Sequence, residues 1–168
     1  TFAMVTIAPS GGFTSGTMQE GLSYEACGVA PDAIVASLDG NGASADLVTY
    51  WVGYNASYLD SYMQYYGGSA LDWSYTMSDG TTMTDYVKND VRSTLIQQLL
   101  LENLAQKYGA ELTEDQSAAI ESDIQSFIDQ YGSEEAFDAE LAKLGLRRET
   151  YERVNAANYL YQNLYKLY

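Results

Sequence analysis

The chain has 168 residues, of which 46% are hydrophobic and 18% are charged, a balance typical of a globular protein rather than a disordered one. Its formal net charge of −15 repels phosphate backbones and anionic membrane surfaces, so nucleic acid is not expected as a partner. The chain has no histidine and only one cysteine, which excludes Ser-His-Asp and Cys-His nucleophile systems, histidine zinc sites and an internal disulfide. We therefore expect no catalytic residue, no metal site and no cofactor.

The N-terminal segment, residues 1–32, is predicted to differ from the rest of the chain. It is rich in Gly, Ser and Thr, with short β-prone fragments at 2–7 and 22–24. Cys27 is interpreted as a structural thiol, because residues 24–26 lack the small and apolar side chains that precede the cysteine of a lipoprotein anchor. No stretch approaches the roughly 20 apolar residues that cross a bilayer, so no transmembrane segment is predicted.

Residues 33–168 are predicted to form a mainly α domain of about five helices in an irregular bundle, with a small β element from the N-terminal segments. A strand is expected over 33–38, ended by the tight-turn pair Asp39-Gly40. Apolar residues then recur every three or four positions, which indicates amphipathic helices. The predicted helices span about residues 44–66, 82–108, 113–131, 133–144 and 148–167.

The expected helix ends carry local signals. Ser44 is predicted to cap the first helix, and Thr113 and Gln116 have the spacing of a capping box. Three glycines are predicted to lie just past helix ends, in the left-handed conformation that favours glycine: Gly109, Gly132 and Gly145.

The long helix at 82–108 is expected to pack against those at 44–66 and 148–167, because these three carry the widest apolar faces. Helices of unequal length do not cover one another completely. We therefore expect an apolar groove to remain, rimmed by carboxylates and containing several of Tyr58, Tyr62, Tyr65 and Trp73.

Tyrosine is the most unusual feature of the composition, with 16 residues that are densest between 50 and 66. One buried helix face does not accommodate so many rings, so some should be exposed. Exposed tyrosine suits a binding surface, because it gives a large contact area with few rotatable bonds. The alternative is core packing with solvated hydroxyls. The candidate peptide-binding residues are Trp51, Tyr54, Tyr58, Tyr62, Tyr65 and Trp73.

Charged residues offer weaker signals. Adjacent carboxylates such as Glu134 and Glu135 are compatible with a glycosidase, but the macrodipole at a helix N-terminus already explains them. The run 39–42 is similar to the start of a calcium loop and lacks the later bidentate acid, so a turn is favoured. Arg147 and Arg148 begin the last predicted helix, where a positive charge is unfavourable, so contacts with acidic neighbours are expected.

Five short motifs follow one another in a distinctive order: Val35–Gly40, Tyr108–Asp115, Tyr131–Phe137, Leu144–Leu146 and Glu149–Tyr151. Their order and spacing resemble the N-terminal chaperone domain of SurA/PrsA-type foldases, which is related to trigger factor. The resemblance covers residues 33–168, whereas residues 1–32 match no family motif.

The resemblance implies a chaperone module of a bacterial extracytoplasmic foldase, secreted or attached to the cell envelope, that binds unfolded or extended polypeptide and performs no chemistry itself. Family members usually add a parvulin-type prolyl isomerase domain whose site is built around histidines. Because this chain has none, we expect it to lack that domain and its activity. Two other functions remain open: a cell-surface carbohydrate-binding or adhesion module that uses the clustered Tyr and Trp residues, and a domain that forms a homodimer through its long helix.

Overall fold

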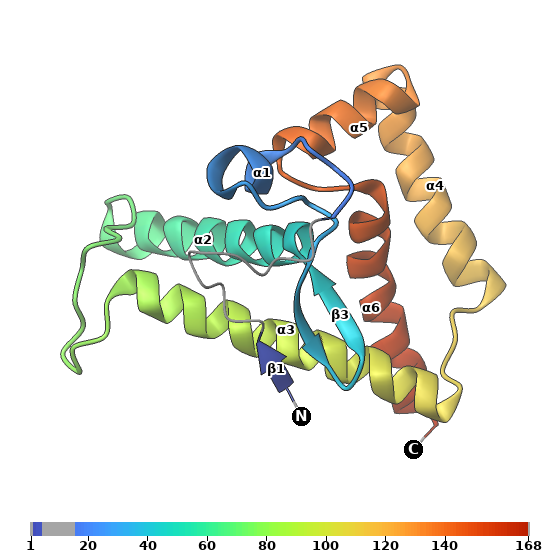
Figure 1. The fold of residues 1–168 in the computed structure, drawn as a ribbon, viewed down its shortest axis with the longest axis horizontal. Coiled ribbons are helices and arrows are strands. Elements are labelled where there is room, and N and C mark those ends of the chain that lie inside the picture. The colour runs from blue at the N-terminus through green and yellow to red at the C-terminus, as the bar shows by residue number, and fades with distance from the viewer. Residues whose placement is uncertain (1, 5–15, 168) are drawn as a thin grey trace.

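The computed structural model describes residues 2–4 and 16–167. In this part the chain is mainly helical, with six helices and a small antiparallel sheet (Figure 1), which confirms the predicted fold class. The elements in chain order are β1 (Phe2–Met4), α1 (Leu22–Cys27), β2 (Ile34–Leu38), β3 (Asn41–Ser44), α2 (Ala45–Gly67), α3 (Met83–Tyr108), α4 (Glu114–Tyr131), α5 (Glu134–Lys143) and α6 (Arg148–Lys166).

The sheet is a tight β2–β3 hairpin with β1 on the other edge of β2, and both pairings are antiparallel. Asp39 and Gly40 form the turn with φ of 49° and 90°, and positive φ at both positions matches a type I′ turn. The predicted strand and turn are thus confirmed. Strand β3 was not predicted, because Asn41 and Gly42 have low strand propensity and the strand depends on its pairing with β2.

The long helix α3 lies at the centre of the main core. Figure 1 shows α2 running antiparallel beside α3, and α6 crossing α3 near the C-terminal end of α3. The predicted packing of the long helix against these two helices is thus confirmed. The buried stripe of α3 recurs every four residues, which places it on one helix face. The main core consists of Val87, Val91, Leu95 and Leu99 of α3 with Ala36, Leu38, Ala43, Leu47 and Val154.

A second core lies between α4, α5 and α6, which gather at one end of the molecule in Figure 1. Its buried residues are Ile120, Ile124, Phe137, Leu141 and Leu146. The far end of the α2–α3 pair projects from the opposite side, connected by residues 68–82. The molecule therefore has a compact end and a projecting end.

Most helix ends follow the predicted signals. The capping box of Thr113 and Gln116 is present with both of its hydrogen bonds. The three predicted glycines have positive φ just past α3, α4 and α5: Gly109 at 69°, Gly132 at 92° and Gly145 at 73°. Ser44 precedes α2 but its side chain makes no capping hydrogen bond. The carboxylate of Asp46 accepts from the backbone N–H of Leu47 instead.

The prediction of a strand at 22–24 is wrong, because these residues begin the six-residue helix α1. Gly21 precedes the helix with a φ of 94° and Gly28 follows it with a φ of 67°. Both values favour glycine, and together the two residues keep the helix short. Cys27 lies exposed at the end of α1, so it is not a core thiol. The predicted β-prone residues 5–7 lie outside the described residues.

Candidate functional site

The six predicted site residues divide into two groups. The first group lies on the part of α2 that runs from near the hairpin to just past the middle of the helix: Trp51, Tyr54 and Tyr58. The second group lies towards the projecting end: Tyr62, Tyr65 and Trp73. Trp51 is half-buried and the other five are exposed, so Tyr54 and Tyr58 belong to the surface rather than to the core.

Trp51 anchors the aromatic face of α2 to α3. Its indole Nε1 donates a hydrogen bond to Oε1 of the buried Gln98 at 2.7 Å, and the Gln98 amide donates to Glu102 at 3.0 Å. The rings of Tyr50 and Tyr54 meet the indole edge-on, with centroids 5.1 and 5.6 Å away. Edge-to-face contacts are favourable, so the position of Trp51 orients both tyrosines.

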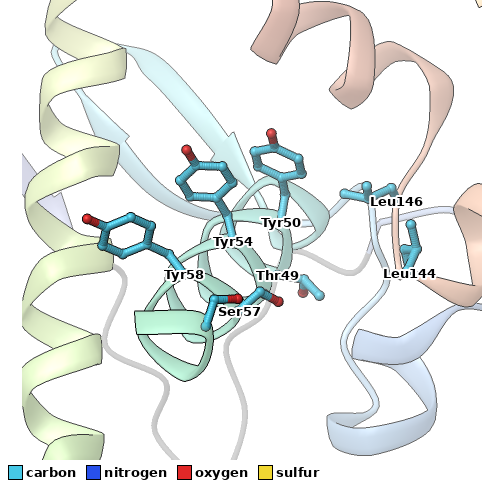
Figure 2. A pocket seen from close by; sticks show the side chains of 9 residues that line it. Thr49, Tyr50, Tyr54, Ser57, Tyr58, Leu144 and Leu146 are labelled. Carbon is cyan, nitrogen blue, oxygen red and sulfur yellow. The ribbon is translucent and has the colours of Figure 1, made fainter. Parts of the chain in front are cut away.

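An open hollow of about 490 Å³ lies between α2 and the connection from α5 to α6. Figure 2 shows Tyr50, Tyr54 and Tyr58 in a row on one side of this hollow, with Leu144 and Leu146 on the other. We call it the α2 hollow. Burial raises the pKa of Tyr50, so its hydroxyl stays neutral well above physiological pH.

Small side chains form the floor of the α2 hollow. Thr49, Gly53, Ser57 and Ser61 recur every four residues, so they form a stripe beside the tyrosines. A Cβ atom added at Gly53 would meet nothing within 4 Å. Glycine inside a helix costs about 1 kcal/mol relative to alanine. At this position it leaves open space between the tyrosines and the two leucines.

A second hollow of about 590 Å³ lies between α2, α3 and α6. We call it the three-helix hollow. It shares Tyr50 and Tyr54 with the α2 hollow, so the two adjoin along these rings. Its apolar lining residues are Tyr50, Trp51, Tyr54, Leu100, Leu101, Leu104, Val154, Ala157 and Tyr161.

The three-helix hollow lies between the three helices predicted to pack together, but the predicted aromatic content and carboxylate rim are wrong for it. In the described part of the chain it is lined by no carboxylate and by none of Tyr58, Tyr62, Tyr65 and Trp73. Its polar lining consists of Thr94, Gln97, Gln98 and Asn158, all of which are neutral. Glu102 of α3 is turned away into an ion pair with Arg153. The surface that a ligand would contact is therefore aromatic and apolar with a few neutral amides.

Two largely buried ion pairs hold α6 against the rest of the fold. The fully buried carboxylate of Asp46 accepts hydrogen bonds from Arg147 Nε at 3.0 Å and from the Thr150 hydroxyl. Arg153 donates two hydrogen bonds to Glu102, at 2.6 and 2.8 Å. These contacts fix the start of α6 on α2 and its middle on α3, which sets the shape of the three-helix hollow.

The environment of Glu102 favours its ionised form. Burial opposes the charge, but hydrogen bonds from Arg153, Asn41 and Gln98 outweigh that effect and lower the pKa of Glu102 below its usual value. Arg153 also donates to the backbone carbonyl of Gly42 at 2.8 Å. One charged cluster thus joins α6, α3 and the hairpin.

The second group of predicted residues lines neither hollow, because α2 extends past the segments that form the opposite walls. At the projecting end the ring of Tyr66 lies 4.6 Å from that of Tyr62 and 4.8 Å from that of Tyr65. Trp73 lies in the connection to α3 and is also exposed. The residues predicted for one groove are therefore divided between the two adjoining hollows and a separate surface at the projecting end. We call this separate surface the arm tip, consisting of Tyr62, Tyr65, Tyr66, Trp73 and Tyr75.

The two arginines at the start of α6 have acidic partners. Arg148 pairs with Glu134 at 3.1 Å and with Asp138 at 2.9 Å, and Arg147 pairs with Asp46, so the expected acidic contacts of the basic pair are confirmed. Among the described residues, no group of three His, Cys, Asp or Glu side chains is arranged to hold a metal ion. In the same part of the chain, no helix combines the length and apolar character that a membrane span requires.

Sequence reasoning missed the hollow residues that other elements contribute: Leu100, Leu101, Leu104, Leu144, Leu146 and Tyr161. Tyr161 follows Val154 and Ala157 at three- and four-residue spacing, so the period of α6 contains a signal for it. Leu144 was predicted as the last apolar residue of the helix at 133–144 but lies just past the end of α5, and Leu146 lies beyond Gly145 in the connection, where periodicity gives no signal.

Comparison with protein-family models, curated proteins and solved structures finds no match for this chain.

Proposed function

We propose that this chain is the chaperone module of an extracytoplasmic foldase, which binds non-native or extended polypeptide and performs no chemistry. The observation that carries the proposal is the pair of adjoining apolar hollows that share Tyr50 and Tyr54. The resemblance of residues 33–168 to SurA/PrsA-type domains supports the same function and the extracytoplasmic location.

The two hollows suit an extended chain. In such a chain every second side chain points to the same face, with a spacing of about 7 Å. One segment crossing the ridge of Tyr50 and Tyr54 therefore places apolar side chains on both sides of it. The exposed hydroxyl of Tyr54 offers a hydrogen bond to the backbone of the bound segment. Since contact area comes from rings rather than from directed polar pairs, sequence preference should be weak.

The competing function is carbohydrate binding, and the exposed rings of the arm tip are the observation that favours it. Sugars stack on flat aromatic faces, but their hydroxyls also need polar partners beside the ring. In the two hollows the larger side chains are mainly leucine and tyrosine, the neutral polar groups are few, and the Trp51 N–H is already bonded to Gln98. Titration with oligosaccharides, followed by the fluorescence of Trp51 and Trp73, tests this function directly.

The proposal is tested by filling the α2 hollow without removing a contact. Gly53→Leu combined with Ser57→Leu adds two side chains to its floor, and the open space at Gly53 accepts the new Cβ. We expect binding of a fluorescent, apolar, extended peptide to weaken about tenfold or more, because the hollow no longer admits its side chains. Suppression of aggregation of an unfolded client should fall in parallel.

The matched control is Ala118→Leu/Ser122→Leu, which adds two leucine side chains, also four residues apart, at exposed positions of α4 outside both hollows. It should bind the peptide as the parent does. Thermal unfolding checks that the filled variant is folded. Unchanged peptide affinity and unchanged suppression of aggregation in a folded Gly53→Leu/Ser57→Leu variant would refute the proposal.

A further inference from the structure

The positive charges of the chain are distributed unevenly. No Lys or Arg precedes Lys88 in the sequence. Between residues 45 and 82, by contrast, lie four carboxylates: Asp46, Asp60, Asp72 and Asp79. Asp46 is paired with Arg147. The other three lie on the far half of α2 and in the connection to α3, the same part of the fold as the arm tip.

These three carboxylates hold hydrogen bonds from neutral groups. Asp60 accepts from a backbone N–H of the connection at 2.8 Å. Hydrogen bonds from Ser74 lower the pKa of Asp72, and hydrogen bonds from Thr81 lower that of Asp79. The ion pairs among the described residues include none of the three. The lowered pKa values keep Asp72 and Asp79 ionised at neutral pH, and none of the three carboxylates is neutralised by an ion pair within the described part of the chain.

The rings of the arm tip are likewise available. All five are exposed, and the Tyr65 side chain is exposed to 81%. The cation–π contacts of the described residues lie elsewhere, at Tyr108 and Phe137. The projecting end thus combines aromatic faces that have no cation of their own with carboxylates from the same segments: Asp72 directly precedes Trp73, and Asp60 accepts a hydrogen bond from the backbone of Leu71.

We infer that the arm tip selects client segments in which Lys or Arg stands beside aromatic or other apolar residues. This inference rests on the proposed function and specifies the class of polypeptide bound. A cation over a Tyr or Trp face is attracted by the negative face of the ring. Asp60, Asp72 and Asp79 add Coulomb attraction at short range, and the net charge of −15 adds it at long range. For an acidic segment each of these effects has the opposite sign.

Three peptides that differ only in charge test the inference. Each contains the same extended aromatic and apolar sequence, flanked by Lys, Gln or Glu residues. Fluorescence anisotropy of the labelled peptides gives the affinities at about 0.05 M and about 0.5 M salt, which brackets weak and strong screening. We expect the Lys peptide to bind about tenfold or more tightly than the Glu peptide at low salt, with the Gln peptide between them. The ratio should shrink at high salt.

A pair of variants separates the arm tip from the general field of the protein. Asp60→Asn/Asp72→Asn/Asp79→Asn removes three charges and keeps an acceptor oxygen at each position. The control Glu121→Gln/Asp123→Asn/Asp129→Asn removes three exposed charges from α4. The arm-tip variant should lose most of the preference for the Lys peptide, and the control should keep most of it.

Equal affinity of the parent for all three peptides would overturn the inference and leave the proposed function standing. An equal loss of preference in both variants would overturn it as well, because the whole-molecule field would then account for the effect. If the parent binds none of the three peptides, the proposed function itself fails, and the inference fails with it.

Discussion

Replacing Arg147 with Met should destabilise the fold strongly while keeping most of the apolar stem of the side chain. Arg147 contributes two side-chain hydrogen bonds to Asp46, whose carboxylate is 0% exposed. Breaking a buried pair by removing one partner costs about 3–5 kcal/mol, because the remaining charge is left in the interior. The Thr150 hydroxyl and the backbone N–H groups of Arg147 and Leu47 still donate to Asp46. The cost should therefore lie near the lower limit, about 3 kcal/mol.

Urea unfolding measures this cost as a change in the free energy of unfolding, and thermal unfolding should show a midpoint lower by roughly 6–12 °C for a chain of this size. Arg147→Met/Asp46→Asn provides the internal check. Removing the stranded charge should recover at least half of the loss, because Asn retains an acceptor for Thr150. A loss below about 1 kcal/mol in Arg147→Met, or a double variant no more stable than the single one, would refute the account of this pair.

Three further changes test other parts of the structure. Gly145→Ala should lower stability and narrow the α2 hollow, because the residue has φ of 73° and the new Cβ would lie 3.0 Å from Leu22; urea unfolding measures the loss. Glu102→Gln should lower the melting midpoint at neutral pH. The midpoint of the variant should also fall less steeply than that of the parent as the pH is lowered. The lowered pKa of Glu102 means that its contribution is present above its usual value of 4.5 and disappears as pH falls through the lower folded-state value; melting midpoints of parent and variant across that range should converge. Asn55→Leu should raise the melting midpoint, since the side-chain nitrogen Nδ2 of Asn55 is buried without a hydrogen-bond partner; a midpoint no higher than the parent's would contradict this.

Local signals were sufficient for most of the helical framework. The capping box of Thr113 and Gln116 and the glycines after α3 and α4 act within one helical turn, so the sequence contains the whole signal. The stripe of α3 is equally local, because a period of four residues specifies a buried face whatever covers it. Strand β3 differs, because it depends on pairing with β2 and propensity alone does not predict it.

The candidate site was harder to predict because it depends on relations between elements. Periodicity identified the tyrosines of α2 but not how far the other helices extend along them. Tyr58 and Tyr62 are one helical turn apart with the same residue type, yet only Tyr58 faces an opposite wall. That wall consists of Leu144 and Leu146, whose position depends on packing of the second core. Successive tyrosines of the same helical repeat thus have different surroundings, because those surroundings are supplied by distant parts of the chain.

Helix α6 completes the three-helix hollow from far along the chain. Arg153 donates to the carbonyl of Gly42 across 111 residues of sequence. During synthesis the N-terminal elements emerge first, so the hairpin, α2 and α3 exist before the helix that supplies the third wall. Until α6 docks, the leucines of α3 and the tyrosines of α2 are exposed together, as they are in any unfolded client. Under the proposed function, the last helix to emerge is the one that turns this exposed apolar surface into a formed client-binding site.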